Sequence, residues 1–133
     1  MNNSNQRTYF YNLEARGYEL DSYNHVNNAV YLNYMEQARW DFFRQINLLS
    51  FLNESQKKLV VVGIDIRYKK EIKLFDKLVI ETRIETQLPY LVFHHRIVNS
   101  ETKMLAARAK VKTLFLDENK IPTDIPKEIL NYA

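Results

Sequence analysis

The segment from Asp21 to Arg39, DSYNHVNNAVYLNYMEQAR, carries the residue types best suited to chemistry in this chain. Asp21 stands in a short polar loop, and the pattern after it predicts a helix that begins at Asn28. Asn27 and Asn28 are suited to cap that helix, because their side-chain oxygens can accept from its first N–H groups. A helix start presents unpaired N–H groups and a partial positive charge. A carboxylate held beside these donors can attack a carbonyl, or direct water at it, while the donors stabilise the oxyanion. The spacing therefore predicts acyl-transfer chemistry.

The elements around this segment begin with one long amphipathic helix, predicted over residues 28–48. Its apolar residues recur at helical spacing and form a single stripe. These residues are Tyr31, Met35, Ala38, Phe42 and Ile46. A helix of this length must bury such a stripe against another layer of the protein.

Alternation with a period of two predicts the strands that supply this layer. The predicted strands cover residues 7–16, 59–70, 77–88, 90–98 and 103–117, and a short helix is expected within 124–132. In the second strand the alternation places one set of residues on a single face, namely Val60, Val62, Ile64, Ile66 and Tyr68. Consecutive strands joined by short turns pair antiparallel. We therefore expect an α+β domain, in which a curved antiparallel sheet of about five strands wraps around one central helix.

The composition predicts one packed globular domain over residues 1–133. Hydrophobic residues make up 46% of the chain and aromatic residues 13%, which is enough for a sizeable core. The absence of cysteine excludes disulfides, a thiol nucleophile and cysteine-ligated metals, and it fits a reducing compartment. The polar N-terminus shows no signal peptide, and no apolar run reaches the roughly 18 residues that span a bilayer. We therefore expect a cytoplasmic protein without a membrane span.

The opening segment and the order of the elements resemble the hot-dog fold of the 4-hydroxybenzoyl-CoA thioesterase-like superfamily. The resemblance lies in an acid, a short loop and then a run of the form His-Val-Asn-Asn-x-x-Tyr-x-x-Tyr-x-Glu-x-Ala-Arg. This chain supplies that run with Asp21 as the acid and His25 as the first residue of the run. The stretch LDSYNHVNNAVY is also similar to the plant plastid acyl-lipid thioesterases of this superfamily. Asn24 stands where many relatives have Gly, and Asn tolerates the left-handed conformation that such a loop requires.

This resemblance implies a thioesterase acting on acyl-CoA or acyl-carrier-protein substrates, with Asp21 and Asn28 as the catalytic residues. Asp21 would be the nucleophile or general base, and the backbone N–H of Asn28 would donate to the thioester carbonyl. From the residues alone, Asp21 could instead only order its loop, and Asn28 could only begin the helix. Because the backbone donor survives in Asn28→Ala, we expect that variant to lose less activity than Asp21→Ala.

Four further residues are expected to contact substrate, namely His25, Asn27, Tyr31 and Glu36. The alternatives that stay open are a loop-positioning role for His25, a purely structural role for Asn27, packing for Tyr31, and a surface ion pair of Glu36 with Arg39. Neighbouring His94 and His95 point to opposite faces of a strand, so the three histidines form no zinc pattern and no metal is expected. No cofactor is implied, since coenzyme A is part of the substrate.

The expected partners are the thioester substrate and further copies of the chain. The net charge of +3 suits an anionic small molecule and is too weak to indicate nucleic acid. Six cations on strands could hold the phosphates of coenzyme A, namely Lys69, Lys70, Arg96, Arg108, Lys110 and Lys112. The resemblance also implies a homodimer or homotetramer with active clefts at the dimer interface. The alternatives are a non-catalytic acyl-CoA-binding hot-dog domain, a scaffold, and a hydratase, although the loop lacks the Asp-x-Asn-Pro-x-His pattern of the hydratases.

Overall fold

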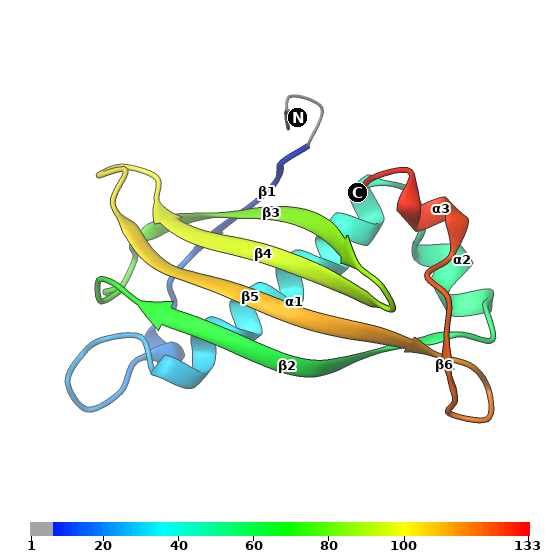
Figure 1. Cartoon of the computed structure of the whole chain (residues 1–133). Coiled ribbons are helices and arrows are strands. Elements are labelled where there is room, and N and C mark those ends of the chain that lie inside the picture. The colour runs from blue at the N-terminus through cyan, green and yellow to red at the C-terminus, as the bar shows by residue number, and fades with distance from the viewer. Residues whose placement is uncertain (1–6) are drawn as a thin grey trace.

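The computed structural model describes residues 7–133 (Figure 1). One long helix follows the first strand and its loop, and the later strands come after a second, short helix. The elements are β1 (Tyr9–Glu14), the 3₁₀ turn η1 (Gly17–Glu19), α1 (Asn28–Gln45), α2 (Leu49–Glu54), β2 (Lys58–Tyr68), β3 (Lys77–Gln87), β4 (Tyr90–Asn99), β5 (Leu105–Leu116), β6 (Pro122–Thr123) and α3 (Lys127–Leu130).

The strands form a single antiparallel sheet in the order β1-β3-β4-β5-β2, with the two-residue strand β6 paired to β5. The sheet curves around α1, which lies across one of its faces, while α2 and α3 stand together at one end (Figure 1). This is the hot-dog fold expected from the sequence, and the strands lie close to the predicted ranges. Strand β2 forms one edge of the sheet, so its outer backbone groups have no neighbouring strand among the described residues.

Helix α1 ends at Gln45, earlier than the predicted residue 48. Asn47 adopts a left-handed conformation with φ 61°, which α-helical residues do not adopt. The N–H of Asn47 donates to the carbonyl of Arg44, and the N–H of Leu48 donates to that of Phe43. This pair of hydrogen bonds is a Schellman motif, which terminates a helix. The chain then turns into α2, a helix that the sequence pattern did not predict.

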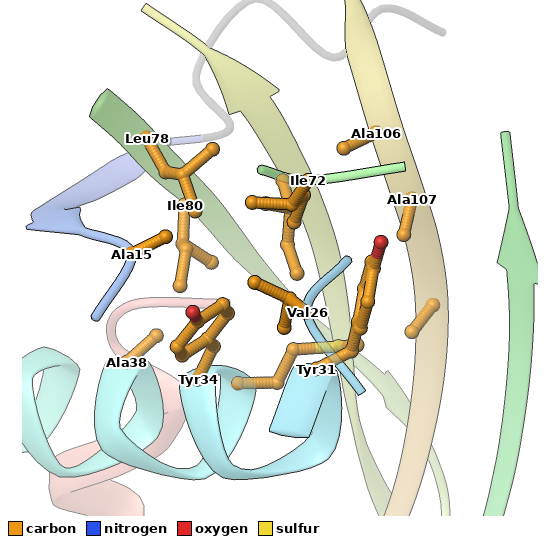
Figure 2. Close-up of a cluster of buried hydrophobic side chains, with 13 residues drawn as sticks. Ala15, Val26, Tyr31, Tyr34, Ala38, Ile72, Leu78, Ile80, Ala106 and Ala107 are labelled. Atoms are coloured by element: carbon orange, nitrogen blue, oxygen red, sulfur yellow. The ribbon is translucent and has the colours of Figure 1, made fainter. Parts of the chain in front are cut away.

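The core consists of two buried clusters along α1. The first surrounds the start of the helix, where Tyr34 and Ala38 point from α1 toward Ile80 of β3 (Figure 2). The second surrounds its end and is built around Phe42, Phe93 and other apolar residues. The rings of Phe42 and Phe93 pack edge to face, with 5.8 Å between their centroids. Together the clusters fix the depth and angle of α1 on the sheet.

Strand β2 contains a bulge that makes the predicted face of this strand wrong in its first half. Val61 lies opposite Thr113, whereas Gly63 lies opposite Lys112, so Val62 is an extra residue. A bulge interrupts the strict alternation of side chains. Residues directly opposite in an antiparallel pair share a face. Pairing with the buried face of β5 therefore places a different set of β2 residues toward the helix, namely Leu59, Val61, Ile64, Ile66 and Tyr68.

Among residues 7–133, no helix has both the length and the apolar character needed to cross a membrane.

Candidate functional site

Asp21 lies in a tight loop between η1 and α1. Its carboxylate oxygen Oδ1 accepts from the backbone N–H of Tyr23 at 2.9 Å and from that of His25 at 3.3 Å. The N–H of Asp21 donates to the carbonyl of His25 at 2.8 Å. Asn24 takes the expected left-handed conformation, with φ 64°. Asp21 therefore orders this loop with one carboxylate oxygen, while its second oxygen, Oδ2, has no hydrogen-bond partner within residues 7–133.

The start of α1 offers the donor that the sequence predicts. The side chain of Asn27 caps the helix by accepting from the N–H of Ala29 at 2.9 Å. The N–H of Val30 donates to the carbonyl of Asn27 at 2.8 Å. The N–H of Asn28, the residue between Asn27 and Ala29, makes no hydrogen bond within the described part of the chain. A free N–H at the first turn of an 18-residue helix also carries the positive end of the helix dipole.

Asp21 and Asn28 line one cavity, here called the proximal cavity, with a volume of about 430 Å³. Its lining residues are Asp21, His25, Val26, Asn28, Tyr31, Tyr68, Lys69, Lys70 and Glu71. Of the six residues singled out in the sequence, the structure brings Asp21, His25, Asn28 and Tyr31 together here. Asn27 lies beside the cavity with its side chain engaged in the cap. Glu36 lies further along α1, in a second cavity.

Tyr31 and Tyr68 form one wall of the proximal cavity. Their rings pack edge to face, with 4.9 Å between the centroids. Tyr31 points from α1 toward Ala107 (Figure 2). The hydroxyl of Tyr68 donates to the carbonyl of Asn28 at 3.1 Å, which ties the end of β2 to the start of α1. Burial raises the pKa of Tyr31, so its hydroxyl stays protonated at neutral pH and serves as a donor rather than a base.

His25 lies at the mouth of the proximal cavity beside Glu71, with Nε2 3.7 Å from a carboxylate oxygen. Both side chains are partly exposed, so this contact is weak. The backbone of His25 pairs with that of Lys73, and the N–H of Val26 donates to the carbonyl of Ile72 at 2.8 Å. The Asp21 loop is thus fastened to the segment that follows β2, which explains how these distant residues reach one site.

Glu19 is a site-supporting residue that the sequence reasoning missed. Its buried carboxylate accepts from the hydroxyl of Tyr34 at 2.6 Å and forms an ion pair with Arg16 at 3.2 Å. Its carbonyl accepts from the N–H of Asn27 at 2.9 Å. Burial, followed by the hydrogen bond to Glu19, raises the pKa of Tyr34. Glu19 therefore stabilises both the start of the Asp21 loop and the N-terminal cap of α1. The sequence offered one weak signal for this role, namely an acidic residue at the end of a turn that contains a glycine.

The second cavity, here called the distal cavity, has a volume of about 330 Å³ and lies between α1, α2 and the first half of β2. Its lining residues are Glu36, Arg39, Trp40, Phe43, Leu52, Asn53, Lys57, Lys58, Leu59, Val61 and Thr113. It is mainly apolar, with Glu36 and Arg39 as the charged residues that α1 contributes. Within residues 7–133, no three side chains of the types that bind metal ions cluster closely enough to hold one.

The proximal cavity places a carboxylate, a free backbone donor and a helix dipole around one space. Such a set can place negative charge, or a water molecule, against a carbonyl carbon and stabilise the oxygen as it becomes an oxyanion. The histidine and tyrosines form the walls, and two lysines supply cations at the rim. This arrangement suits hydrolysis of an activated acyl group that enters from solvent.

The family comparison gives a match over nearly the whole chain. Residues 16–132 match the model of the thioesterase-like superfamily. The long-chain acyl-CoA thioesterase FadM of Escherichia coli is 38% identical over 73 residues, which is 55% of this chain and 55% of that protein. The acyl-CoA thioesterase YbgC of Haemophilus influenzae is 30% identical over 126 residues, which is 92% of this chain and 87% of that protein. The chain thus spans about half the length of the first of these relatives and most of the second.

Among solved structures, YbaW of Escherichia coli, described as a probable thioesterase, superimposes with a TM-score of 0.83 at 26% identity. The match covers 92% of this chain and 94% of that one. The correspondence therefore extends over most of both chains.

Proposed function

Because the chain belongs to the thioesterase-like superfamily, we propose that it is a thioester hydrolase that cleaves acyl-CoA or acyl-carrier-protein thioesters in the proximal cavity. The proposal rests on one observation above all, that Asp21 and the free N–H of Asn28 line the same cavity. FadM and YbgC are both named acyl-CoA thioesterases, which supports coenzyme A as one of the two carriers. The lysines at the rim, Lys69 and Lys70, are suited to its phosphates.

In the proposed reaction, Asp21 acts on the thioester while Asn28 holds the carbonyl oxygen. As a general base, Asp21 takes a proton from water, and the resulting hydroxide adds to the carbonyl carbon. The oxyanion accepts from the N–H of Asn28 and is stabilised by the helix dipole. The carbon–sulfur bond then breaks, the thiolate takes the proton held by Asp21, and the free carboxylic acid leaves. As a nucleophile, Asp21 would instead add to the carbonyl carbon and expel the thiolate, which takes a proton from solvent, to leave a mixed anhydride. Water then hydrolyses the anhydride to the free acid and the Asp21 carboxylate.

The role of the Asn28 backbone can be tested by comparing Asn28→Pro with Asn28→Ala. Proline removes the N–H and is tolerated at the first position of a helix, where that N–H has no intrahelical partner. Asn27, with φ −59° and ψ 137°, already has the conformation that a residue before proline requires. We expect Asn28→Pro to lower kcat by about 10²–10³-fold, the usual effect of losing an oxyanion donor. We expect Asn28→Ala, which keeps the N–H, to lose much less.

Thermal melts of both variants provide the control for this comparison. If the two variants melt close to the wild type and lose activity to the same extent, the side chain and not the backbone N–H matters, and the assignment of the donor is wrong. The same conclusion follows if Asn28→Pro keeps full activity.

We also propose that the protein assembles as at least a dimer through the edge strand β2. This strand is 11 residues long, and several of its apolar residues are more than two-fifths exposed, namely Val61, Val62, Ile64 and Tyr68. A long apolar edge strand is usually covered by another chain. Because Tyr68 also lines the proximal cavity, a second copy at this edge would lie beside the site. We expect light scattering to show a dimer or tetramer that Ile64→Lys weakens, whereas a wild-type monomer at micromolar concentration would contradict this assembly.

A further inference from the structure

Within one protomer, the two cavities lie at opposite ends of the surface between α1 and β2, beside the strand edge at which we place the second copy. The proximal cavity reaches Tyr68 at the end of β2, and the distal cavity reaches Val61 near its start. Between them, Ile64 faces the helix side of the sheet but remains 44% exposed. A long acyl group whose thioester sits at Asn28 can therefore follow β2 toward the distal cavity over apolar surface.

The wall of the distal cavity contains an arginine held by a neutral histidine. A guanidinium nitrogen of Arg39 lies 3.3 Å from Nε2 of His95, and Nδ1 of His95 lies 2.9 Å from the hydroxyl of Thr82. Arginine can only donate, so Nε2 must accept and Nδ1 carries the proton. Burial, followed by the charges of Arg39 and His94, lowers the pKa of His95 to about 3. The histidine thus fixes the position of Arg39 without neutralising its charge.

Arg39 retains donors that no group within residues 7–133 uses. Its guanidinium lies 5.9 Å from the centre of the Phe93 ring, and no carboxylate within residues 7–133 comes close enough to form an ion pair with it. Glu36 lines the same cavity one turn earlier on α1. On its α1 side the cavity therefore presents the donor-only Arg39 and the acceptor-only Glu36, beside the apolar Trp40 and Phe43. Two further cations line it from the start of β2, namely Lys57, whose ammonium donates to the carbonyl of Asp124, and the exposed Lys58.

A hydroxyl group can satisfy both Arg39 and Glu36 at once, because it accepts from the guanidinium and donates to the carboxylate. A plain hydrocarbon would leave the donors of Arg39 desolvated, which costs free energy. A carboxylate would pair with Arg39 and be repelled by Glu36. We propose that the distal cavity selects long acyl groups that carry a hydroxyl far from the thioester, with Arg39 and Glu36 as the specificity-determining residues. This inference rests on the proposed function, because it takes the acyl group to start at Asn28.

The distance along α1 sets the length of that acyl group. Glu36 and Arg39 follow Asn28 by eight and eleven residues on the same helix. At about 1.5 Å per residue, this places them roughly 12–17 Å along the axis. Helical side chains lean toward the N-terminus, which shortens the span for Arg39. A single hydroxylated aromatic ring is too short to reach them, so the hydroxyl must lie well along an extended chain.

The experiment compares hexadecanoyl-CoA with hydroxyhexadecanoyl-CoA isomers whose hydroxyl is moved stepwise along the chain. We expect kcat/KM to peak at one distal position, at least tenfold above that of hexadecanoyl-CoA. Arg39→Met keeps the length of the side chain and removes its donors. It should therefore abolish the peak and raise kcat/KM for hexadecanoyl-CoA, because the hydrocarbon then desolvates no donor. Gln37→Met, at an exposed position on the same helix that lines neither cavity, is the matched control and should keep the peak.

Three results would overturn this inference. The first is a wild type that cleaves every isomer at the same rate as hexadecanoyl-CoA, which leaves the proposed thioesterase function intact. The second is an Arg39→Met variant that folds and loses activity equally on both kinds of substrate, since that marks a structural role. The third result comes from binding alone, with the wild type and non-hydrolysable thioether analogues. Calorimetry that gives the same affinity for analogues with and without the hydroxyl would contradict the selectivity. If the protein cleaves no acyl thioester but binds the hydroxylated analogue more tightly, the proposed function is wrong and the proposed selectivity of the distal cavity is retained.

Discussion

Buried His95 should make the protein less stable as the pH falls below neutral. Its side chain is only 1% exposed and is hydrogen-bonded on both ring nitrogens, to Arg39 and to Thr82. Its pKa is lowered from 6.5 to about 3, chiefly by burial. The unfolded chain therefore binds one more proton than the folded protein between these two values, so acid favours unfolding over that window.

The size of the effect follows from the two pKa values. Each pH unit in the window changes the free energy of unfolding by about 1.36 kcal/mol for one such group. At pH 5 the solution is about 1.5 units below the pKa of the unfolded histidine, so the loss relative to pH 7.5 is about 2 kcal/mol. Carboxylates add their own losses, but mainly at lower pH.

The assay is urea unfolding of the wild type and of His95→Gln at pH 7.5 and at pH 5. Glutamine can accept from Arg39 and donate to Thr82, yet it does not titrate. The wild type should lose about 2 kcal/mol more than the variant between the two pH values. Equal losses in the two proteins would refute the reasoning. If the variant does not fold, an NMR titration of the wild type decides instead, because a His95 ring that protonates above pH 5 contradicts a buried neutral histidine.

Further predictions concern the supports of the proximal cavity. Asn27→Ala removes the helix cap and should cost about 1 kcal/mol in the free energy of unfolding, measured in urea, whereas Asn27→Asp should retain most of it. Tyr34→Phe removes the hydroxyl that donates to the buried carboxylate of Glu19, which keeps its contacts with Arg16, and should cost about 1–3 kcal/mol in the free energy of unfolding. An unchanged melting temperature would contradict a stabilising role for this hydrogen bond. Tyr68→Phe frees the start of α1 from β2 and should lower kcat with little change in the melting temperature. In a single turnover in ¹⁸O-labelled water, a general-base Asp21 puts the label only into the product acid, whereas a nucleophilic Asp21 can itself acquire it.

Much of the candidate site could be predicted from the sequence because its signals are local. The cap by Asn27, the left-handed Asn24 and the free N–H of Asn28 depend on neighbours only a few residues away. Helix α1, the order of the elements along the chain and the pairing of β3 with β4 and of β4 with β5 followed from periodicity and short turns, whereas the pairing of β2 with β5 and of β1 with β3 did not. By contrast, the contact of Glu19 with Tyr34 spans 15 residues, and the residues from Lys69 to Glu71 join the cavity through pairing of β2 with β5. Such contacts depend on how the layers pack, which no local pattern specifies.

The errors in the predicted elements also have local physical causes. The end of α1 was placed too late because an apolar stripe continues past Asn47, although the left-handed backbone at that residue ends the helix. The face of β2 was wrong in its first half because the bulge at Val62 shifts the alternation. Gly63 beside it is the one signal in the sequence, since an isolated glycine in a strand often marks a bulge. That bulge turns Val61 toward the distal cavity and so affects the second site as well.

The central claim is that Asp21 carries out thioester hydrolysis in the proximal cavity. Thiol release from a panel of acyl-CoAs, short, long and aromatic, should be measured for the wild type and for Asp21→Asn. The asparagine keeps an oxygen for the N–H groups of Tyr23 and His25, so the loop should retain its shape while the charge is lost. We predict hydrolysis of at least one acyl-CoA by the wild type and its near-complete loss in a folded Asp21→Asn variant. Hydrolysis that survives in Asp21→Asn would contradict the role of Asp21, and tight acyl-CoA binding without any hydrolysis would contradict the enzyme itself.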